Sequence, residues 1–246
     1  MRSSVAILAT ATLVGALVAG GAGAATRSAA TCNPAYEYCD PGALPAGAYT
    51  TQYFLPGMRV RLPSRGWSSP QDSTNELRLH PPGYSDATFL RFWTDPRLST
   101  ACSDRVISAR ITTPAQAVRW FRSNKELLVS PPRQATIAGH VAALTIDVDL
   151  SPTAPRCGAS CPGPCIDYFL FFGGTAPDAT DLAPGHTPGA KDGFGSARGE
   201  LVRFYFAEIR KPARLFVVGV DTYSKKDFAA LTPVASTLLA KLHLPS

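Results

Sequence analysis

Two aspartates share the clearest strand pattern in the chain. Between His140 and Leu150, an apolar residue at every second position alternates with a series that includes Asp147 and Asp149. Residues two apart on a strand share one face and lie about 7 Å apart, a separation at which one carboxyl group can act as acid and the other as base. The alternative is a solvated outer face. We favour that alternative, because no neighbour in the sequence would raise either pKa and no third catalytic partner is identifiable.

The remaining residue patterns do not favour catalysis. The four histidines, His80, His140, His186 and His243, lack the HxH or HExxH spacing of zinc hydrolases. The sequence also lacks GxSxG, the commonest layout of a serine hydrolase. We therefore expect a noncatalytic binding or scaffold domain with no catalytic residue, no cofactor and no metal. A secreted hydrolase with a scattered, motif-free site is the alternative.

Arginines recur at alternate positions of several expected strands. Arg59 and Arg61 point outward if their apolar neighbours face the core, and the same alternation exposes Arg78, Arg91 and Trp93. Consecutive strands of a meander are usually neighbours, so the four arginines would share one face. Guanidinium groups suit phosphate and carboxylate, and the indole of Trp93 would stack on a sugar or an arginine. The alternative is that these are ordinary polar residues at solvated strand positions.

Six cysteines are distributed unevenly along the chain. They are Cys32, Cys39, Cys102, Cys157, Cys161 and Cys165. An even number in an exported protein favours disulfides. The first two would close a small loop, whereas Cys102 would bond one thiol of the CGASCPGPC segment and leave the other two to bond each other. A metal site made by these three thiols is the alternative, which the lack of a nearby histidine disfavours.

The N-terminal segment has the pattern of a secretory signal peptide. From Val5 to Ala24 every residue is apolar, Gly or Thr, and the segment ends in small residues. Residues 1–24 are therefore expected to be removed after Ala24, leaving no transmembrane segment. Because the apolar run is long enough to span a bilayer, a retained anchor is the alternative.

The net charge of the chain is modestly positive, with 24 Lys and Arg against 18 Asp and Glu. Such a charge does not imply a nucleic acid partner. An exported protein first meets anionic envelope polymers and lipid headgroups, so these are the partners we expect at the cell envelope, outside the cytoplasm.

The expected elements give an α+β fold with a mainly antiparallel sheet. Residues 25–48, rich in Pro, Ala and Gly, are expected to form a flexible arm before a single domain at 49–246. The expected strands are Tyr49–Phe54, Met58–Leu62, Glu76–His80, Thr88–Trp93, Leu127–Ser130, Gln134–Ala138, His140–Leu150, Ile166–Phe172, Glu200–Ile209 and Arg214–Asp221. Residues 175–198 are expected to form a long loop.

Two helical regions carry capping signals. Thr113, Pro114 and Gln116 predict a helix from Pro114 to about Asn124. Ser224 caps a second region near the C-terminus, where Pro233 predicts two short helices that meet at the proline.

Three segments resemble a group of secreted or lipid-anchored proteins of unknown function from high-GC Gram-positive bacteria. They are YTTQYFLPGMRVRLPSRGW, LLVSPPRQATIAGHVAALTIDVDL and KKDFAALTPVASTLLAKLHLP. The order of elements is also similar to the Mog1/PsbP-like fold, an α/β/α sandwich on an antiparallel sheet. This resemblance covers residues 49–246 and implies partner binding rather than chemistry, and it brings no family active site. The CGASCPGPC segment and the long loop depart from the pattern.

Overall fold

The structure is a computed structural model that describes residues 31–34, 38–98, 111–155, 165–171, 192–210 and 213–245. The helices are α1 (Pro114–Ser123) and α2 (Lys225–Ala240). The strands are β1 (Thr31–Asn33), β2 (Tyr38–Asp40), β3 (Gly42–Ala43), β4 (Gly47–Thr50), β5 (Arg59–Leu62), β6 (Ser68–Ser73), β7 (Glu76–His80), β8 (Phe89–Thr94), β9 (Arg97–Leu98), β10 (Leu127–Val129), β11 (Arg133–Ile137), β12 (Val141–Leu150), β13 (Cys165–Phe171), β14 (Asp192–Ala197), β15 (Leu201–Arg210) and β16 (Ala213–Thr222).

The main sheet contains eleven of the described strands. Its order is β1-β2-β6-β7-β8-β16-β15-β12-β10, with β3 paired to β6 and β11 paired to β12. All of these pairs are antiparallel, and the longest joins β15 to β16 from Leu201 opposite Thr222 to Arg210 opposite Ala213. The described residues therefore have the expected α+β class with a mainly antiparallel sheet.

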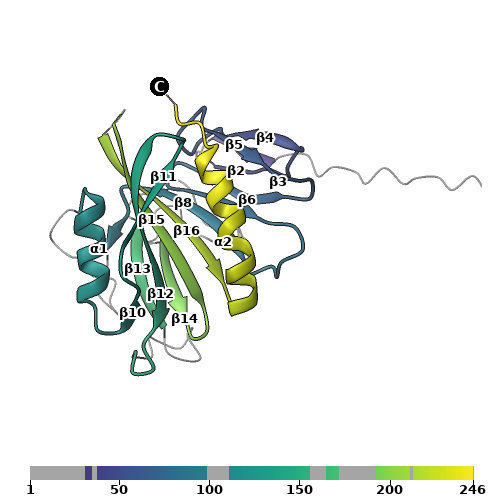
Figure 1. Ribbon diagram of the computed structural model, residues 1–246. Helices are drawn as coiled ribbons and strands as arrows, with labels where there is room; N and C mark the ends of the chain where they lie inside the picture. Colours follow the sequence, from purple (N-terminus) through teal and green to yellow (C-terminus); the bar gives the residue numbers. More distant parts are fainter. Residues whose placement is uncertain are drawn as a thin grey trace, which may run out of the picture.

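Helix α2 lies across one face of the main sheet (Figure 1). Its buried residues Leu231 and Leu238 belong to one core with Phe92 of β8 and Val218 of β16. The hairpin of β4 and β5 contributes Val60 to the same core. Burial of this apolar surface fixes both the helix and the hairpin on the sheet.

A second layer covers the opposite face of the main sheet. It contains α1 and the small sheet β14-β13-β9. Phe121 of α1 and Phe194 of β14 pack there against Phe204 and Trp93 of the main sheet, and the ring centroids of Phe121 and Phe204 lie 5.0 Å apart. Side chains of the central strands that point away from the first core therefore enter a second core, not water.

The predicted capping box starts helix α1. The hydroxyl of Thr113 accepts the backbone N–H of Gln116 at 3.3 Å, and the side-chain oxygen of Gln116 accepts the backbone N–H of Thr113 at 3.2 Å. Pro114 occupies the first turn, where its missing N–H costs nothing. The helix ends at Ser123, so the expected helix is confirmed to within one residue.

The C-terminal region forms one helix, which corrects the expected pair of short helices. Pro233 lies inside α2 on its exposed side, where water can reach the carbonyl of Ala229 that the proline leaves without a helical donor. On the opposite side, Leu231, Ala235 and Leu238 form a continuous buried stripe. Packing of this stripe outweighs the single missing backbone hydrogen bond.

Much of the segment expected to be a flexible arm belongs to the folded structure. Strand β2 pairs with β6, and Tyr38 and Cys39 are each only 1% exposed. Cys39 forms the predicted disulfide with Cys32. Leu44 is also buried in the first core. The expectation of a flexible arm is wrong because the strands among these Pro and Gly residues are too short to give a recognisable pattern, and their pairing partners in β6 lie far away in the sequence.

Strand β6 was missed because its sequence, SSPQDS, is polar. Its Asp72 is fully buried, and the carboxylate accepts the Tyr49 hydroxyl at 2.6 Å and the backbone N–H groups of Gln52 and Phe54 at 2.6 and 2.7 Å. Burial and the adjacent carboxylate of Asp72 raise the pKa of Tyr49. These donors compensate the buried charge and hold the turn that leads from β4 to β5.

The expected loop at 175–198 is shorter than predicted at its C-terminal end. Strand β14 occupies Asp192–Ala197 and pairs with β13. Its sequence, DGFGSA, has only one large apolar residue, Phe194, which enters the second core. The rest of the expected loop up to residue 191 lies outside the described residues.

Candidate anion-binding face

The structure divides the five residues of the expected arginine face into two groups. Arg59 and Arg61 are exposed on β5, as expected. Arg78 and Arg91 lie opposite each other on β7 and β8, with only 12% and 14% of their side chains exposed, and Trp93 is fully buried. The expectation of one shared arginine face is therefore wrong, and Trp93 is not available for stacking on a ligand.

The second layer of the structure explains why this expectation is wrong. Arg91 lies on the face of the main sheet that the small sheet covers, and its guanidinium group lies 5.0 Å from the ring centroid of Phe194 in β14. Arg91 Nε donates to Asp221 at 2.8 Å, and Arg91 Nη1 lies 3.2 Å from Glu76. Arg78 Nε lies 3.1 Å from the same carboxylate of Glu76. These two arginines neutralise buried carboxylates and hold strands together.

A third buried carboxyl group lies close to this network. Glu200 is only 3% exposed, and its Oε2 accepts the backbone N–H of Ala197 at 3.0 Å. Burial, together with the negative charge of Asp221, raises the pKa of Glu200 to about 7. Its neighbour Tyr223 has a pKa raised to about 12, by burial and by the nearby carboxyl group of Glu200. A shifted carboxyl group of this kind also occurs in enzymes. The preceding residues Arg198 and Gly199 line a hollow of about 310 Å³ together with Asp149, whereas Glu200 itself is not among the residues that line it.

The exposed pair Arg59 and Arg61 is joined by two further basic residues from the segment after α2, Lys241 and His243. The segment after α2 pairs with β5 at His243, which donates its backbone N–H to the carbonyl of Arg59 and accepts the N–H of Arg59, both at 2.9 Å. Lys241 is the C-cap of α2 and lies in a turn, where it lines the same hollow as Arg59 and Arg61. Arg59 and Arg61, two apart on β5, share a face, His243 lies opposite Arg59, and the common hollow brings Lys241 to the same surface.

We call Arg59, Arg61, Lys241 and His243 the basic face. All four residues are exposed, and together with Ala48 of β4 they line a shallow hollow of about 390 Å³. Among the residues that the structure describes, none of the four makes an ion pair or a side-chain hydrogen bond, and no acidic side chain lines the hollow. Three permanent positive charges on one surface are therefore available to an anion.

The two strand aspartates are not an acid and base pair. The carboxylate of Asp147 is paired with the guanidinium groups of Arg203 and Arg133, the latter at 2.9 Å. Burial alone would raise the pKa of Asp147, but the hydrogen bonds and charges of Arg203 and Arg133 outweigh it and lower the pKa. Asp149 Oδ1 accepts the backbone N–H of Leu150 at 2.7 Å. Both carboxylates therefore have structural partners.

Of the described histidines, His140 and His243 lie near each other, whereas His80 has a different environment. His80 lies with its Nε2 3.0 Å from the carbonyl of Ser85, while His140 and His243 line a common pocket that is described below. His186 lies outside the described residues. Within the described part of the chain, no group of three or more His, Cys, Asp or Glu residues has an arrangement that could hold a metal ion.

The other cysteine predictions are not tested. Cys102, Cys157 and Cys161 lie outside the described residues, and Cys165 is described only as the first backbone position of β13. The signal segment at residues 1–24 also lies outside them. Neither of the two described helices is long and apolar enough to cross a membrane.

Sequence reasoning missed Lys241 and His243 as members of the site. The signal for them was present, because Lys241-Leu242-His243-Leu244 alternates polar and apolar residues as an edge strand does. This alternation predicts a strand but not its partner, and β5 precedes it by about 180 residues of sequence.

Comparisons with protein-family models, with curated protein sequences and with solved structures give no match for this chain. The functional argument therefore rests on the basic face itself.

Proposed function

We propose that this protein is an exported, noncatalytic binding domain of the bacterial cell envelope that holds phosphate-bearing anions on the basic face. The observation that carries the proposal is the convergence of Arg59, Arg61, Lys241 and His243 on one exposed surface without a carboxylate among them. Phosphate groups are the common chemistry of envelope polyanions such as teichoic acids and of anionic lipid headgroups.

The electrostatics of the basic face favour such a ligand. Arg59 and Arg61 present planar guanidinium groups that can bind two phosphate oxygens at once, and Lys241 adds a mobile point charge. The strands beneath these residues are held by backbone hydrogen bonds and by the first core, so the spacing of the charges is fixed before binding.

The location proposed for the protein rests on its sequence and its disulfide. Residues 1–24 have the pattern of a signal peptide, and the Cys32–Cys39 disulfide is typical of an oxidising compartment. We further propose that the fold is a Mog1/PsbP-like α/β/α sandwich. Helices α2 and α1 on opposite faces of an antiparallel sheet support this proposal, as do the resembling segments.

The alternative, a secreted hydrolase with a scattered site, lacks a supporting arrangement among the described residues. The aspartate that was its best candidate, Asp147, is paired with two arginines. The perturbed Glu200 is itself buried, and its side chain accepts the backbone N–H of Ala197.

The experiment compares the double variant Arg59→Ser plus Arg61→Ser with a matched control, Arg119→Ser plus Arg122→Ser. The control removes the same charge from exposed positions of α1, on the opposite side of the main sheet. Binding of both proteins and the wild type is measured by titration calorimetry with soluble poly(glycerol phosphate), with phosphatidylglycerol vesicles and with polyglutamate.

We expect the basic-face variant to bind phosphate ligands about 2- to 30-fold more weakly, because exposed charge contacts contribute about 0.2–1 kcal/mol each and two are removed. The affinity should fall as salt is raised, since exposed charges are screened. Polymer and vesicle titrations distinguish the two sources of phosphate. Equal losses in both double variants would show that only the net charge matters, and the proposal would then be wrong.

A further inference from the structure

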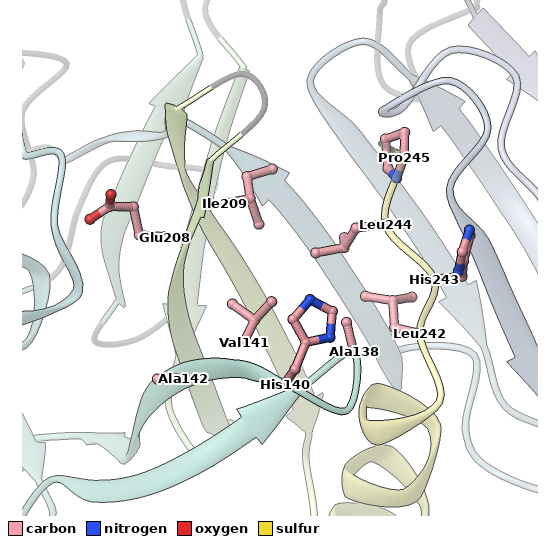
Figure 2. Close-up of a pocket in the computed structure, with 10 residues that line it drawn as sticks. All are labelled: Ala138, His140, Val141, Ala142, Glu208, Ile209, Leu242, His243, Leu244 and Pro245. Carbon is pink, nitrogen blue, oxygen red and sulfur yellow. The ribbon is translucent and has the colours of Figure 1, made fainter.

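A second hollow lies beside the basic face. It has a volume of about 650 Å³ and lies between the turn from β11 to β12, the end of β15 and the segment after α2 (Figure 2). A hollow of this volume is within the range of sites that enclose a small organic ligand.

The lining of this hollow is mainly apolar. It includes Ala138, Val141, Ile209, Leu242 and Leu244. The imidazole of His140 lies among these residues, whereas the carboxylate of Glu208 is turned away from them (Figure 2). The hollow therefore suits an alkyl chain better than a charged group.

The segment after α2 separates the two hollows and contributes to both. Leu242 and Leu244 point toward the apolar hollow, and His243 points to the other side of the segment, toward β5 (Figure 2). His243 lines both the apolar hollow and the basic face. The segment thus contributes Leu242 and Leu244 to the apolar hollow and His243 to both hollows.

We infer that the ligand is a single-chain anionic lipid, with its phosphate group on the basic face and its acyl chain in the apolar hollow. This inference rests on the proposed function and adds to it the class of the ligand. Charge complementarity at the basic face selects a phosphate, and the adjacent apolar hollow selects one that carries an alkyl chain. A polymer without a lipid chain would leave this hollow empty.

The test uses monoacyl phosphatidylglycerols with chains of increasing length, each below its critical micelle concentration, and glycerol phosphate as the chainless probe. Affinities are measured by titration calorimetry on the wild type. We expect the affinity to rise about fourfold for each added methylene until the hollow is filled, because each buried methylene contributes a constant increment.

Two variants close the hollow in different ways. Val141→Trp fills it, and Leu244→Asp places a charge in it; Val129→Trp, at a half-buried strand position on the other side of the main sheet, is the matched control. Both hollow variants should lose the dependence on chain length and keep the affinity for glycerol phosphate. Arg59→Ser plus Arg61→Ser should have the opposite effect: the affinity for every probe should fall, while each added methylene should still raise the affinity about fourfold. Thermal unfolding identifies any variant that fails to fold. If one hollow variant fails to fold, the other one tests whether the acyl chain binds in the hollow.

The two claims fail separately. If glycerol phosphate and poly(glycerol phosphate) bind the wild type at the basic face and chain length has no effect, the lipid inference is overturned and the proposed function stands. If chain length increases the affinity while Arg59→Ser plus Arg61→Ser changes nothing, the basic face is not the phosphate site and both claims are overturned.

Discussion

Replacement of Arg91 by methionine tests the view that this arginine is structural and not part of a binding surface. Arg91 donates to Asp221 at 2.8 Å and lies 3.2 Å from Glu76. The side chain of Asp221 is 1% exposed and that of Glu76 is 7% exposed. Burial disfavours the charged form of Arg91, but Asp221 and Glu76 outweigh this effect and raise its pKa. The charge on Arg91 is thus required by its surroundings.

The expected loss of stability follows from the groups that remain after the substitution. Methionine preserves most of the side-chain volume, so the change leaves little cavity. Glu76 keeps Arg78 as a partner, but Asp221 keeps only the backbone N–H of Phe89, at 2.8 Å, among the contacts described here. Breaking one member of a buried ion pair typically costs about 3–5 kcal/mol, because the other charge stays buried without compensation. We expect Arg91→Met to lower the free energy of unfolding by that amount at pH 8.

Urea unfolding of the protein with the Cys32–Cys39 disulfide intact measures this loss. The control is Arg59→Met, at an exposed position, for which we expect a change within about 0.5 kcal/mol. Adding Asp221→Asn to Arg91→Met should recover part of the loss, because the amide oxygen still accepts the N–H of Phe89 but carries no charge. A loss below about 1 kcal/mol for Arg91→Met, or no recovery in the double variant, would refute the structural role of the ion pair.

Two other buried carboxyl groups give further predictions. Because the pKa of Glu200 is raised in the folded protein, the wild type should lose roughly 3 kcal/mol of its free energy of unfolding as the pH rises from about 4.5 to 7. Glu200→Gln should lack this pH dependence and be more stable than the wild type at pH 8. The same change of the free energy of unfolding with pH in both proteins, measured by urea unfolding, would contradict this prediction. Asp72→Asn should lower the free energy of unfolding by about 2–3 kcal/mol, because one amide oxygen replaces a carboxylate that accepts the Tyr49 hydroxyl and backbone N–H groups. The control Asp86→Asn, at an exposed site, should unfold at the same urea concentration as the wild type.

Local patterns predicted the elements whose cause is local. Thr113 and Gln116 form the capping box that the sequence indicates, and the alternation from Val141 to Leu150 gives β12. Strand β6 was beyond such reasoning, because its buried Asp72 is compensated by donors about 20 residues away in the sequence. A helix-breaking signal at Pro233 was likewise overruled by tertiary packing of α2.

The candidate site was predicted in part for the same reason. Alternation correctly placed Arg59 and Arg61 on the outside of β5. It also indicated that Arg78 and Arg91 lie on one face of neighbouring strands, which the register confirms. Alternation does not say what covers a face, and here the small sheet encloses Arg91. Nor does it indicate that His243 pairs with β5, since that contact joins two distant parts of the chain.

The most direct test of the central claim is a nitrogen-15 NMR titration of the protein with soluble poly(glycerol phosphate). The account predicts that the largest shifts occur at the backbone amides of Arg59, Arg61, Lys241 and His243, that they saturate, and that they shrink as salt is added. Amides of α1 around Arg119 and Arg122 should not move. Shifts centred on α1, or spread evenly over every exposed lysine and arginine, would contradict a binding site at the basic face.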